Sequence, residues 1–434
     1  MPVRLSHDQA DFEDRFAAFL GVKRAAQGDA DAVAAEIIAE VRARGAEALI
    51  GLTRRFDRLE LTAATLAITS DEIDAAAARV PAAERAALEL ATARIRAYHE
   101  RQLPSDAEWQ DAAGVTLGWR WTPVDAAGLY VPGGLASYPS SVLMNAIPAR
   151  IAGVQRLVMC APTPGGEVNP LVLLAARLAG VDEVWRIGGA QAIATMAYGA
   201  GPVRPVDKIV GPGNAYVAAA KRRVFGDVGI DMIAGPSEVL VIADRDNDPD
   251  WIALDLLAQA EHDASAQSIL MTDDSGLAEA VARAVERRLQ GLSRAGIAGT
   301  SWRDFGALIV VRDLAQAAGL SNRVAPEHLQ LCVAGPERLV PLIRHAGAIF
   351  LGAHTPEAIG DYVGGPNHVL PTAGAARFSS GLSVLDFMKR TTIARVPARA
   401  MAALGPAAAT LARSEGLEAH ALSLQARLGA AGDG

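Results

Sequence analysis

Two short segments of the chain carry side chains suited to metal binding and proton transfer. The first runs from Gln259 to His262, inside a stretch whose apolar residues predict a helix over 252–266. Side chains three residues apart lie one above the other on a helix, so the amide and the imidazole can face one pocket. Glu261 points elsewhere and is a weaker candidate ligand. The spacing therefore predicts part of a metal site.

Two residues cannot complete the coordination shell of zinc, so further ligands must come from distant parts of the chain. Asp361 follows a predicted helix start at Thr355-Pro-Glu357 and precedes the bend Gly364-Gly-Pro366, where a carboxylate can turn toward a pocket. His420, near the start of the last predicted helix, is another candidate. Glutamine is an uncommon zinc ligand and a lone histidine is more often structural, so residue types alone leave the site open.

The second segment, Pro326-Glu-His328, places a carboxylic acid beside an imidazole where a loop enters a predicted strand. Proline fixes one backbone angle just before the pair. An imidazole can accept a proton from an alcohol near neutral pH, and a carboxylate can activate water. Neighbours in an extended segment point apart, so we expect Glu327 and His328 to serve separate steps. The alternative is a solvated pair at the edge of a loop.

Three glycine-rich turns precede these segments: Val131-Pro-Gly-Gly134, Ile187-Gly-Gly-Ala-Gln191 and Val210-Gly-Pro-Gly-Asn214. A strand, a glycine turn and a helix in succession aim backbone N–H groups at a phosphate. The third turn does not complete the dinucleotide motif, because Tyr216 stands where a third glycine would allow close packing of helix and strand. Each turn alone is more often chain punctuation. Each of the three turns is followed by a polar residue: Tyr138, Gln191 or Asn214. Together the turns indicate either ordinary chain reversals or a Rossmann-like nucleotide site.

The apolar pattern along the chain predicts an α/β fold. Residues from about 27 to 105 show helical spacing, and beyond Trp121 short apolar strands alternate with helices, as in parallel sheets covered on both faces. The predicted strands are 157–161, 183–187, 208–210, 238–242, 268–271, 307–311, 329–333 and 348–351. An alanine-rich segment around 395–412 is expected to be a helix or linker that leads to a final amphipathic helix over 417–428.

Length and composition limit the classes of protein to consider. A chain of 434 residues predicts two or more domains, and a net charge of −8 without a basic run disfavours nucleic acid as a partner. No apolar stretch has the length of a signal segment or membrane helix, so we expect a cytoplasmic protein without a membrane partner. Cys160 and Cys332 lie in apolar runs and are expected to be buried reduced thiols.

The ordered motifs resemble the histidinol dehydrogenase family along nearly the whole chain. The matching segments are Leu129-Tyr-Val-Pro-Gly-Gly134, Pro139-Ser-Ser-Val-Leu-Met144, Gly188-Gly-Ala-Gln-Ala192, Val210-Gly-Pro-Gly-Asn-Ala215, Ala234-Gly-Pro-Ser-Glu-Val239, Gln259-Ala-Glu-His262, Ala325-Pro-Glu-His328, Gly364-Gly-Pro-Asn-His368, Arg377-Phe-Ser-Ser-Gly-Leu382 and Glu415-Gly-Leu-Glu-Ala-His420. Residues 1–25 and 275–300 carry no motif. The resemblance implies a zinc enzyme of histidine biosynthesis that oxidises L-histidinol through the aldehyde to L-histidine, with two successive hydride transfers to NAD.

The resemblance also implies a role for individual residues. It implies one Zn²⁺ per subunit, held by Gln259, His262, Asp361 and His420, and an acid–base pair formed by Glu327 and His328. It further implies that Ser237, His328 and Glu415, together with the zinc ligands, hold histidinol, and that Tyr130, Gln191 and Asn214 contact NAD.

The fold implied by the resemblance consists of two related, incomplete Rossmann-like α/β domains with small N- and C-terminal arms. We expect an N-terminal arm over 1–25, a first α/β domain formed by 26–129 and 237–381, an inserted NAD-contacting domain over 130–236, and a dimerisation arm over 382–434. The family forms an intertwined homodimer, so His420 and Glu415 are expected to complete the site of the neighbouring subunit.

Two other functions compete with this interpretation. A relative in the same superfamily oxidises another polar alcohol, such as a sulfonated diol, and would keep zinc and NAD but replace residues that hold the imidazole. The presence of both Glu415 and His420 favours histidinol. A catalytically inactive metal-binding or nucleotide-sensing module would not need the pair Glu327 and His328, which counts against it.

Overall fold

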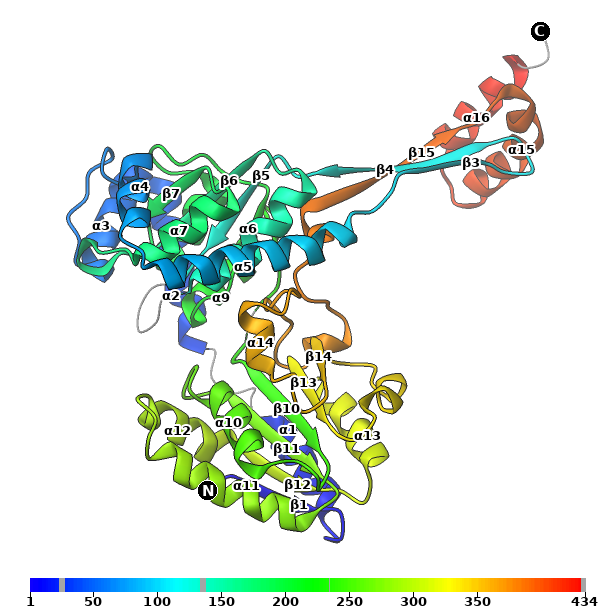
Figure 1. The fold of residues 1–434 in the computed structure, drawn as a ribbon. Helices are drawn as coiled ribbons and strands as arrows, with labels where there is room; N and C mark the ends of the chain where they lie inside the picture. The colour runs from blue at the N-terminus through cyan, green and yellow to red at the C-terminus, as the bar shows by residue number, and fades with distance from the viewer. Residues whose placement is uncertain (23–27, 133–137, 234, 431–434) are drawn as a thin grey trace. The chain divides into compact units, whose positions relative to one another are not determined.

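The computed structural model describes residues 1–22, 28–132, 138–233 and 235–430 (Figure 1). The chain forms two compact units. One comprises Met1–Gln102 and Asp125–Asp386, and the other comprises Leu103–Val124 and Phe387–Gly434. Helices and mostly parallel strands fill the first unit, which confirms the predicted α/β class. Among the described residues, no helix is long and apolar enough to cross a membrane.

One sheet of the first unit has the strand order β2-β7-β6-β5-β8-β9, and all its pairs are parallel except β2 with β7. Its strands are β2 (Ala67–Ile68), β5 (Ala126–Tyr130), β6 (Arg156–Ala161), β7 (Glu183–Arg186), β8 (Lys208–Val210) and β9 (Gly229–Ile230). The chain builds outward from β5 through β6 and β7, then returns to add β8 on the other side of β5. The carboxyl ends of β5 and β8 therefore border the crevice where open α/β sheets bind ligands.

Helices pack against this sheet because its strands are apolar on both faces. They are α2 (Gly28–Arg44), α3 (Ala46–Asp57), α4 (Ser70–Ala78), α5 (Ala82–His99), α6 (Pro139–Ala152), α7 (Pro170–Ala179), α8 (Gly189–Tyr198) and α9 (Ala215–Val224). Alternate strand residues such as Val158 and Ile209 share a core with α2, α3, α8 and α9. This packing places the first turns of α8 and α9 at the carboxyl edge of the sheet.

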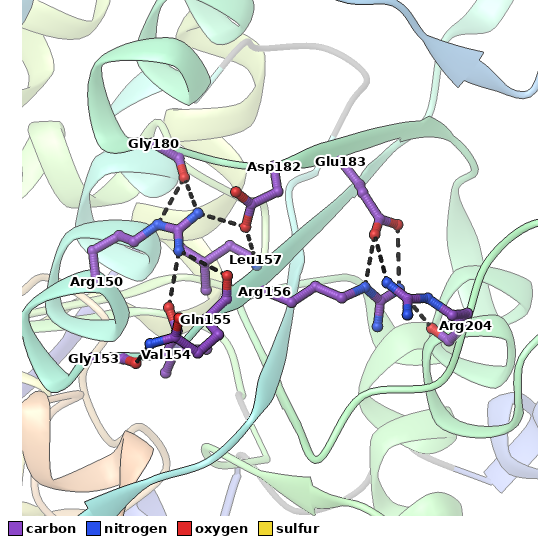
Figure 2. A network of polar contacts seen from close by, with 10 residues as sticks. All are labelled: Arg150, Gly153, Val154, Gln155, Arg156, Leu157, Gly180, Asp182, Glu183 and Arg204. Atoms are coloured by element: carbon purple, nitrogen blue, oxygen red, sulfur yellow. Dashed lines mark hydrogen bonds and ion pairs between the residues drawn. The ribbon is translucent and has the colours of Figure 1, made fainter.

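Charged side chains fasten the opposite, amino edge of the same sheet. Arg150 of α6 donates from Nε to the carbonyl of Gly180 at 2.8 Å and pairs with Asp182, just before β7 (Figure 2). Arg156 and Glu183 lie on the adjacent strands β6 and β7, and Nε of Arg156 donates to Oε1 of Glu183 at 2.7 Å. These contacts fix the amino ends of β6 and β7 relative to each other, at the edge opposite the carboxyl ends of β5 and β8.

The second sheet of the first unit is parallel throughout, in the order β1-β12-β11-β10-β13-β14. Its strands are β1 (Val3–Ser6), β10 (Glu238–Ala243), β11 (Gln267–Thr272), β12 (Ala307–Val310), β13 (His328–Cys332) and β14 (Ala348–Leu351). The helices beside it are α1 (Phe12–Gly21), α10 (Pro249–Ala260), α11 (Ser275–Leu289), α12 (Ala295–Phe305), α13 (Leu314–Val324) and α14 (Glu357–Tyr362).

Side-chain alternation along β13 decides where its polar residues point. Leu329 and Leu331 belong to the core shared with α1 and α13, whereas Cys332 belongs to the core shared with α10, α11 and α12. Because successive strand residues face opposite sides, His328 and Gln330 lie on the same side as Cys332, toward α10. The strand therefore aims its first residue, His328, at the helix that carries Gln259.

The helix predicted over 252–266 is shorter in the structure. α10 starts at Pro249 behind the capping side chain of Asp248 and ends at Ala260. Asp263 accepts a hydrogen bond from the N–H of Ser265 at 2.8 Å, so its side chain favours a turn over further helix. His262 lies in this turn, where its N–H donates to the carbonyl of Gln259 at 3.2 Å. The backbones of Gln259 and His262 thus stay hydrogen-bonded through the turn, but the predicted helix does not extend to His262.

The second unit is an antiparallel sheet followed by two helices. The sheet has the order β15-β4-β3, formed by β3 (Ala107–Gln110), β4 (Thr116–Pro123) and β15 (Met388–Arg395), and the helices are α15 (Ala398–Ser414) and α16 (Glu418–Ala430). Trp109 and Trp119 meet edge to face across β3 and β4 at 5.2 Å between ring centres. The helices were predicted, but the exposed and strongly polar sheet was not.

Both cysteines are buried and free, as predicted. Burial raises the pKa of the Cys160 thiol, and it raises the pKa of Cys332 to about 11. A thiol with a raised pKa carries little thiolate near neutral pH, so neither residue is a candidate nucleophile.

Helix α3 ends on a buried carboxyl group, which makes the stability of the protein depend on pH. Asp57 is 8% exposed, its Oδ2 has no hydrogen-bond partner among the described residues, and burial raises its pKa above the ordinary value of 3.8. A carboxylate at this position also meets the negative end of the helix dipole.

We expect Asp57→Asn to raise the unfolding temperature near neutral pH. The folded protein binds the Asp57 proton more tightly than the unfolded chain, so stability falls as pH rises from 3.8 through the raised folded value. The gain from the amide should therefore shrink as pH is lowered below about 4. Thermal unfolding across this range measures the gain, with the exposed Asp246→Asn as control. An equal gain at every pH would contradict the prediction.

Candidate active site

The backbone of a single residue, Glu238, holds the two candidate acid–base residues at the amino ends of β10 and β13. Oε2 of Glu327 accepts a hydrogen bond from the N–H of Glu238 at 2.9 Å, and Nδ1 of His328 lies 2.9 Å from the carbonyl oxygen of the same residue. Nδ1 of His328 and Oε2 of Glu327 are 3.7 Å apart, beyond hydrogen-bond distance. The two side chains are therefore fixed by the backbone and not by each other. Ser237 immediately precedes β10 at this edge.

The contact with Glu238 also fixes which nitrogen of His328 can act as a base. A carbonyl oxygen only accepts hydrogen bonds, so Nδ1 must carry the proton and Nε2 must hold the lone pair. His328 is 5% exposed, and its Nε2 has no hydrogen-bond partner in the described parts of the chain. The geometry gives a buried nitrogen that is ready to accept a proton.

Two carboxyl groups from α14 converge on His328. Ligand atoms of His328, Glu357 and Asp361 all lie within 4.8 Å of one another. Glu357 is 2% exposed, its Oε2 has no partner among the residues described, and burial, reinforced by the charge of Asp361, raises its pKa to about 8. Three side chains of metal-ligand type thus meet at one point.

The end of α10 carries a buried amide and, just beyond it, an imidazole. Gln259 is fully buried, and neither Oε1 nor Nε2 has a hydrogen-bond partner within the described ranges. The protein surrounding the ring lowers the pKa of His262, while the charge of Asp361 acts in the opposite direction and His328 adds to the lowering. Because Asp361 and His328 both act on His262, these groups share one electrostatic environment.

This donor set fits a divalent metal. A buried amide costs free energy unless something satisfies its polar atoms, and those of Gln259 are satisfied by no described residue. One amide oxygen, one imidazole and one carboxylate are acceptable ligands for zinc. The residues Gln259, His262 and Asp361 of the first unit could therefore hold such an ion.

The segment after α14 anchors Asp361. Nδ1 of His368 donates to the carbonyl of Asp361 at 3.1 Å, and its Nε2 lies 3.4 Å from Oγ of Ser141 on α6. Burial lowers the pKa of His368. Nδ2 of Asn367 donates to the carbonyl of Met144 on α6 at 2.6 Å. The segment that follows Asp361 is thus fastened to α6.

Sequence reasoning assigned no role to Glu357 and His368, although both stood in segments it had noted. The four-residue spacing from Glu357 to Asp361 would have placed both carboxyl groups on one face of the predicted helix. His368 ends the motif Gly364-Gly-Pro-Asn-His368.

Two predicted site residues lie in the second compact unit. Glu415 follows the last residue of α15, and His420 is in the first turn of α16. Both are exposed. Asp361, His262, Gln259 and Ser237 all belong to the first unit.

The predicted nucleotide contacts line the carboxyl edge of the sheet that contains β5. Tyr130 ends β5, is 4% exposed, and accepts a hydrogen bond from the N–H of Gly189 through its hydroxyl at 3.1 Å. Burial raises the pKa of Tyr130 to about 12. Gln191 is 1% exposed in the first turn of α8. Gly133 and Gly134 of the first glycine turn lie outside the described residues.

The third glycine turn packs differently from the expectation. Asn214 is exposed and caps α9 by accepting hydrogen bonds from the N–H groups of Tyr216 and Val217, each at 3.1 Å. Tyr216 is 44% exposed, so its ring does not press against the sheet. The close approach to β5 is made by Gly211 instead, where an added Cβ would collide with the carbonyl oxygen of Tyr130.

Open α/β sheets, glycine turns at one sheet edge and a buried imidazole beside side chains of metal-ligand type are the combination expected of an α/β enzyme. The model of the histidinol dehydrogenase family matches residues 22–428. The chain belongs to the histidinol dehydrogenase family.

Individual relatives agree with this assignment. The chain is 70% identical to histidinol dehydrogenase of Ruegeria pomeroyi and 63% identical to that of Rhizobium meliloti, in each case over 99% of both chains. The crystal structure of histidinol dehydrogenase from Elizabethkingia anophelis is 35% identical, superposes with a TM-score of 0.93, and covers 99% of this chain and 98% of its own.

We expect Gln259→Leu to stabilise the metal-free protein by about 1–3 kcal/mol, because it removes a buried amide without partners. The same change should abolish stabilisation by added Zn²⁺, since a metal ligand is lost. Thermal unfolding with and without Zn²⁺ measures both effects.

Gln330→Leu is the matched control, because Gln330 is equally buried but bonded. Its Nε2 donates to Asp255 at 2.6 Å and its Oε1 accepts from the N–H of Glu357 at 3.2 Å. This variant should lose stability. Loss of stability in metal-free Gln259→Leu would show that the amide has partners after all.

Proposed function

We propose that the protein is a zinc- and NAD-dependent histidinol dehydrogenase, which oxidises L-histidinol through L-histidinaldehyde to L-histidine in the last step of histidine biosynthesis. The observation that carries the proposal is the contact between Nδ1 of His328 and the carbonyl of Glu238. It leaves Nε2 of His328 as the basic nitrogen, close to the metal-ligand side chains Glu357 and Asp361. Membership of the family supports the choice of substrate.

The proposed metal site holds one Zn²⁺ per subunit. Gln259, His262 and Asp361 would supply a neutral amide, a neutral imidazole and one carboxylate, and the partner subunit's His420 would complete the set. A bound ion would supply a positive charge that attracts the polar groups of histidinol and helps these residues to orient the substrate. Ser237, His328 and the partner subunit's Glu415 would contact histidinol. This arrangement requires an intertwined homodimer.

The first oxidation uses His328 as the base. Its Nε2 accepts the proton of the alcohol while the carbon-bound hydrogen leaves as hydride, and the aldehyde forms. The hydride acceptor is the nicotinamide of NAD, which becomes NADH. Because Nδ1 is already bonded to the carbonyl of Glu238, the imidazole can take this proton without turning.

The second oxidation uses Glu327. Its carboxylate takes a proton from water as the water oxygen bonds to the aldehyde carbon. The resulting hydrate loses a second hydride to a second NAD and a proton, which gives the carboxylate of L-histidine. The contact between Glu327 and the N–H of Glu238 keeps the carboxylate at the amino edge of the sheet for this step.

NAD would bind at the carboxyl edge of the sheet that contains β5 and β8. Tyr130, Gln191 and Asn214 lie at that edge, and Gly189 and Gly211 have positive φ angles of 64° and 111°, which glycine adopts without strain. Because glycine has no side chain, a pyrophosphate can approach the backbone and the positively polarised start of α9 closely there. We further propose a cytoplasmic location, without nucleic acid or membrane as partner.

We expect the purified protein to form two NADH for each L-histidinol consumed, and a chelator to abolish this activity. Absorbance of NADH follows the reaction, and readdition of Zn²⁺ should restore it. Simple alcohols and sulfonated diols should not be oxidised, which separates the proposal from the related dehydrogenases. Undiminished turnover by metal-free protein would refute the zinc requirement, and no turnover with any alcohol would favour the inactive binding module.

We expect His328→Asn to slow oxidation of L-histidinol by about 10²–10⁴-fold, the range that loss of a general base produces. Glu327→Gln should slow oxidation of L-histidinaldehyde by a similar factor and affect the alcohol step far less. Single-turnover measurements with each substrate separate the two steps. Equal losses in both steps for both variants would rule out the division of labour.

A further inference from the structure

A buried ion pair lies beneath the third glycine turn. The side chains of Lys221, on α9, and Asp231, just after β9, are 3% and 1% exposed and pair directly. Neither the metal cluster nor the acid–base step uses them. A lysine and an aspartate are almost never buried so completely without a reason, because their charges are costly to remove from water.

Both partners of the pair bind the same residue. Nζ of Lys221 lies 3.0 Å from the carbonyl oxygen of Gly211, and Oδ2 of Asp231 accepts a hydrogen bond from the N–H of Gly211 at 2.8 Å. Oδ1 of Asp231 also accepts from the N–H of Met232 at 2.6 Å. The ion pair thus holds Gly211 by both of its backbone polar groups.

The backbone of Gly211 has a conformation that few residues can adopt, and the two hydrogen bonds from the ion pair stabilise it. Its φ of 111° is open to glycine and strained for other residues, and an added Cβ would collide with the carbonyl oxygen of Tyr130. The turn leads directly to Asn214, which caps α9. The position of Gly211 therefore sets the position of the first N–H groups of α9 relative to the end of β5.

Stability alone does not explain the pair. A buried ion pair can usually be replaced by apolar residues at little cost or with a gain, since desolvation offsets the attraction between the charges. What apolar residues cannot do is bind the N–H and the carbonyl of Gly211 at once. The pair is therefore suited to fix a backbone position.

We propose that Lys221 and Asp231 are positioning residues for the dinucleotide, acting through Gly211 on the turn that faces its pyrophosphate. The inference rests on the proposed use of NAD and goes further, because it assigns two residues that touch neither cofactor nor substrate. Loss of the pair should weaken binding of the dinucleotide and leave the metal, histidinol and the proton transfers unaffected.

The test compares the double variant K221M/D231N with wild-type protein. The double change removes both charges together, so neither is left buried alone, and the asparagine can still accept from Gly211. We expect the dissociation constant for NADH, measured by fluorescence titration, to rise by about tenfold or more, as misplacement of a binding group by a fraction of an ångström produces. The KM for histidinol, the bound zinc and kcat at saturating NAD should stay within about twofold.

The control R223M/D31N removes an ion pair from the same helix. Arg223 and Asp31 are 39% and 41% exposed and bond at 2.6 Å, but neither touches the turn. This variant should bind NADH as wild-type protein does. A weakened control would show that α9 responds to any loss of charge, which would overturn the assignment.

Hydrogen exchange in the wild-type protein keeps the inference testable if the double variant does not fold. The amide of Gly211, resolved by comparing overlapping peptides that end at residues 210 and 211, should be protected before any dinucleotide is added. Rapid exchange of this amide would overturn the proposal. So would unchanged NADH affinity in a folded double variant, while failure of wild-type protein to bind NADH would remove the proposed function itself.

Discussion

The backbone of Glu238 is the constraint on which the proposed chemistry depends. Its N–H binds Glu327 and its carbonyl binds His328, so the two backbone polar groups of one residue set the positions of both acid–base side chains. This residue stays in place because β10 is an inner strand, paired with β11 on one side and β13 on the other. In that register Val239 faces His328, which brings the preceding peptide beside the first residues of β13. A base held by sheet geometry needs no second side chain to orient it.

The two parallel sheets serve the proposed reaction from opposite edges. In the sheet of β5 and β8, the glycine turns and the caps of α8 and α9 gather at the carboxyl edge, the usual place for a ligand in open α/β sheets. In the sheet of β10 and β13, the polar cluster gathers at the amino edge, where α10 ends and β13 begins. The position of the cluster at the amino edge follows from the proposed chemistry, which needs side chains as metal ligands and as bases. A carboxyl edge offers backbone N–H groups at helix starts, whereas the end of α10 offers the long side chains of Gln259 and His262.

The sequence predicted the parallel strands well, because strands covered on both faces leave continuous apolar runs such as Val239 to Ala243. It did not predict β3, β4 and β15, whose residues are largely polar or aromatic and whose pairing joins segments far apart in the chain. Within the site, spacing related Gln259 to His262, the position of Asp361 before a bend made it a candidate ligand, and motif resemblance joined the three residues in one set. The convergence of Glu357 on His328 depends on where α14 packs after β14, which no local pattern encodes. The end of α10 was missed because the side chain of Asp263 competes with the helix for backbone hydrogen bonds.

The distribution of unsatisfied polar atoms separates the site from the core around it. Gln330 is as deeply buried as Gln259, two residues along the strand from His328, and both ends of its amide are bonded. Gln259, Nε2 of His328 and Oε2 of Glu357 have no such partners among the described residues. Other buried polar atoms without described partners, such as Oδ2 of Asp57, lie elsewhere in the chain, and each one lowers stability. Those carried by α10, β13 and α14 differ in type, because an amide, an imidazole nitrogen and a carboxyl oxygen can all bind a cation or a polar substrate. A cation and a polar substrate supply the missing partners together, which is why metal binding and catalysis are expected to fail as one.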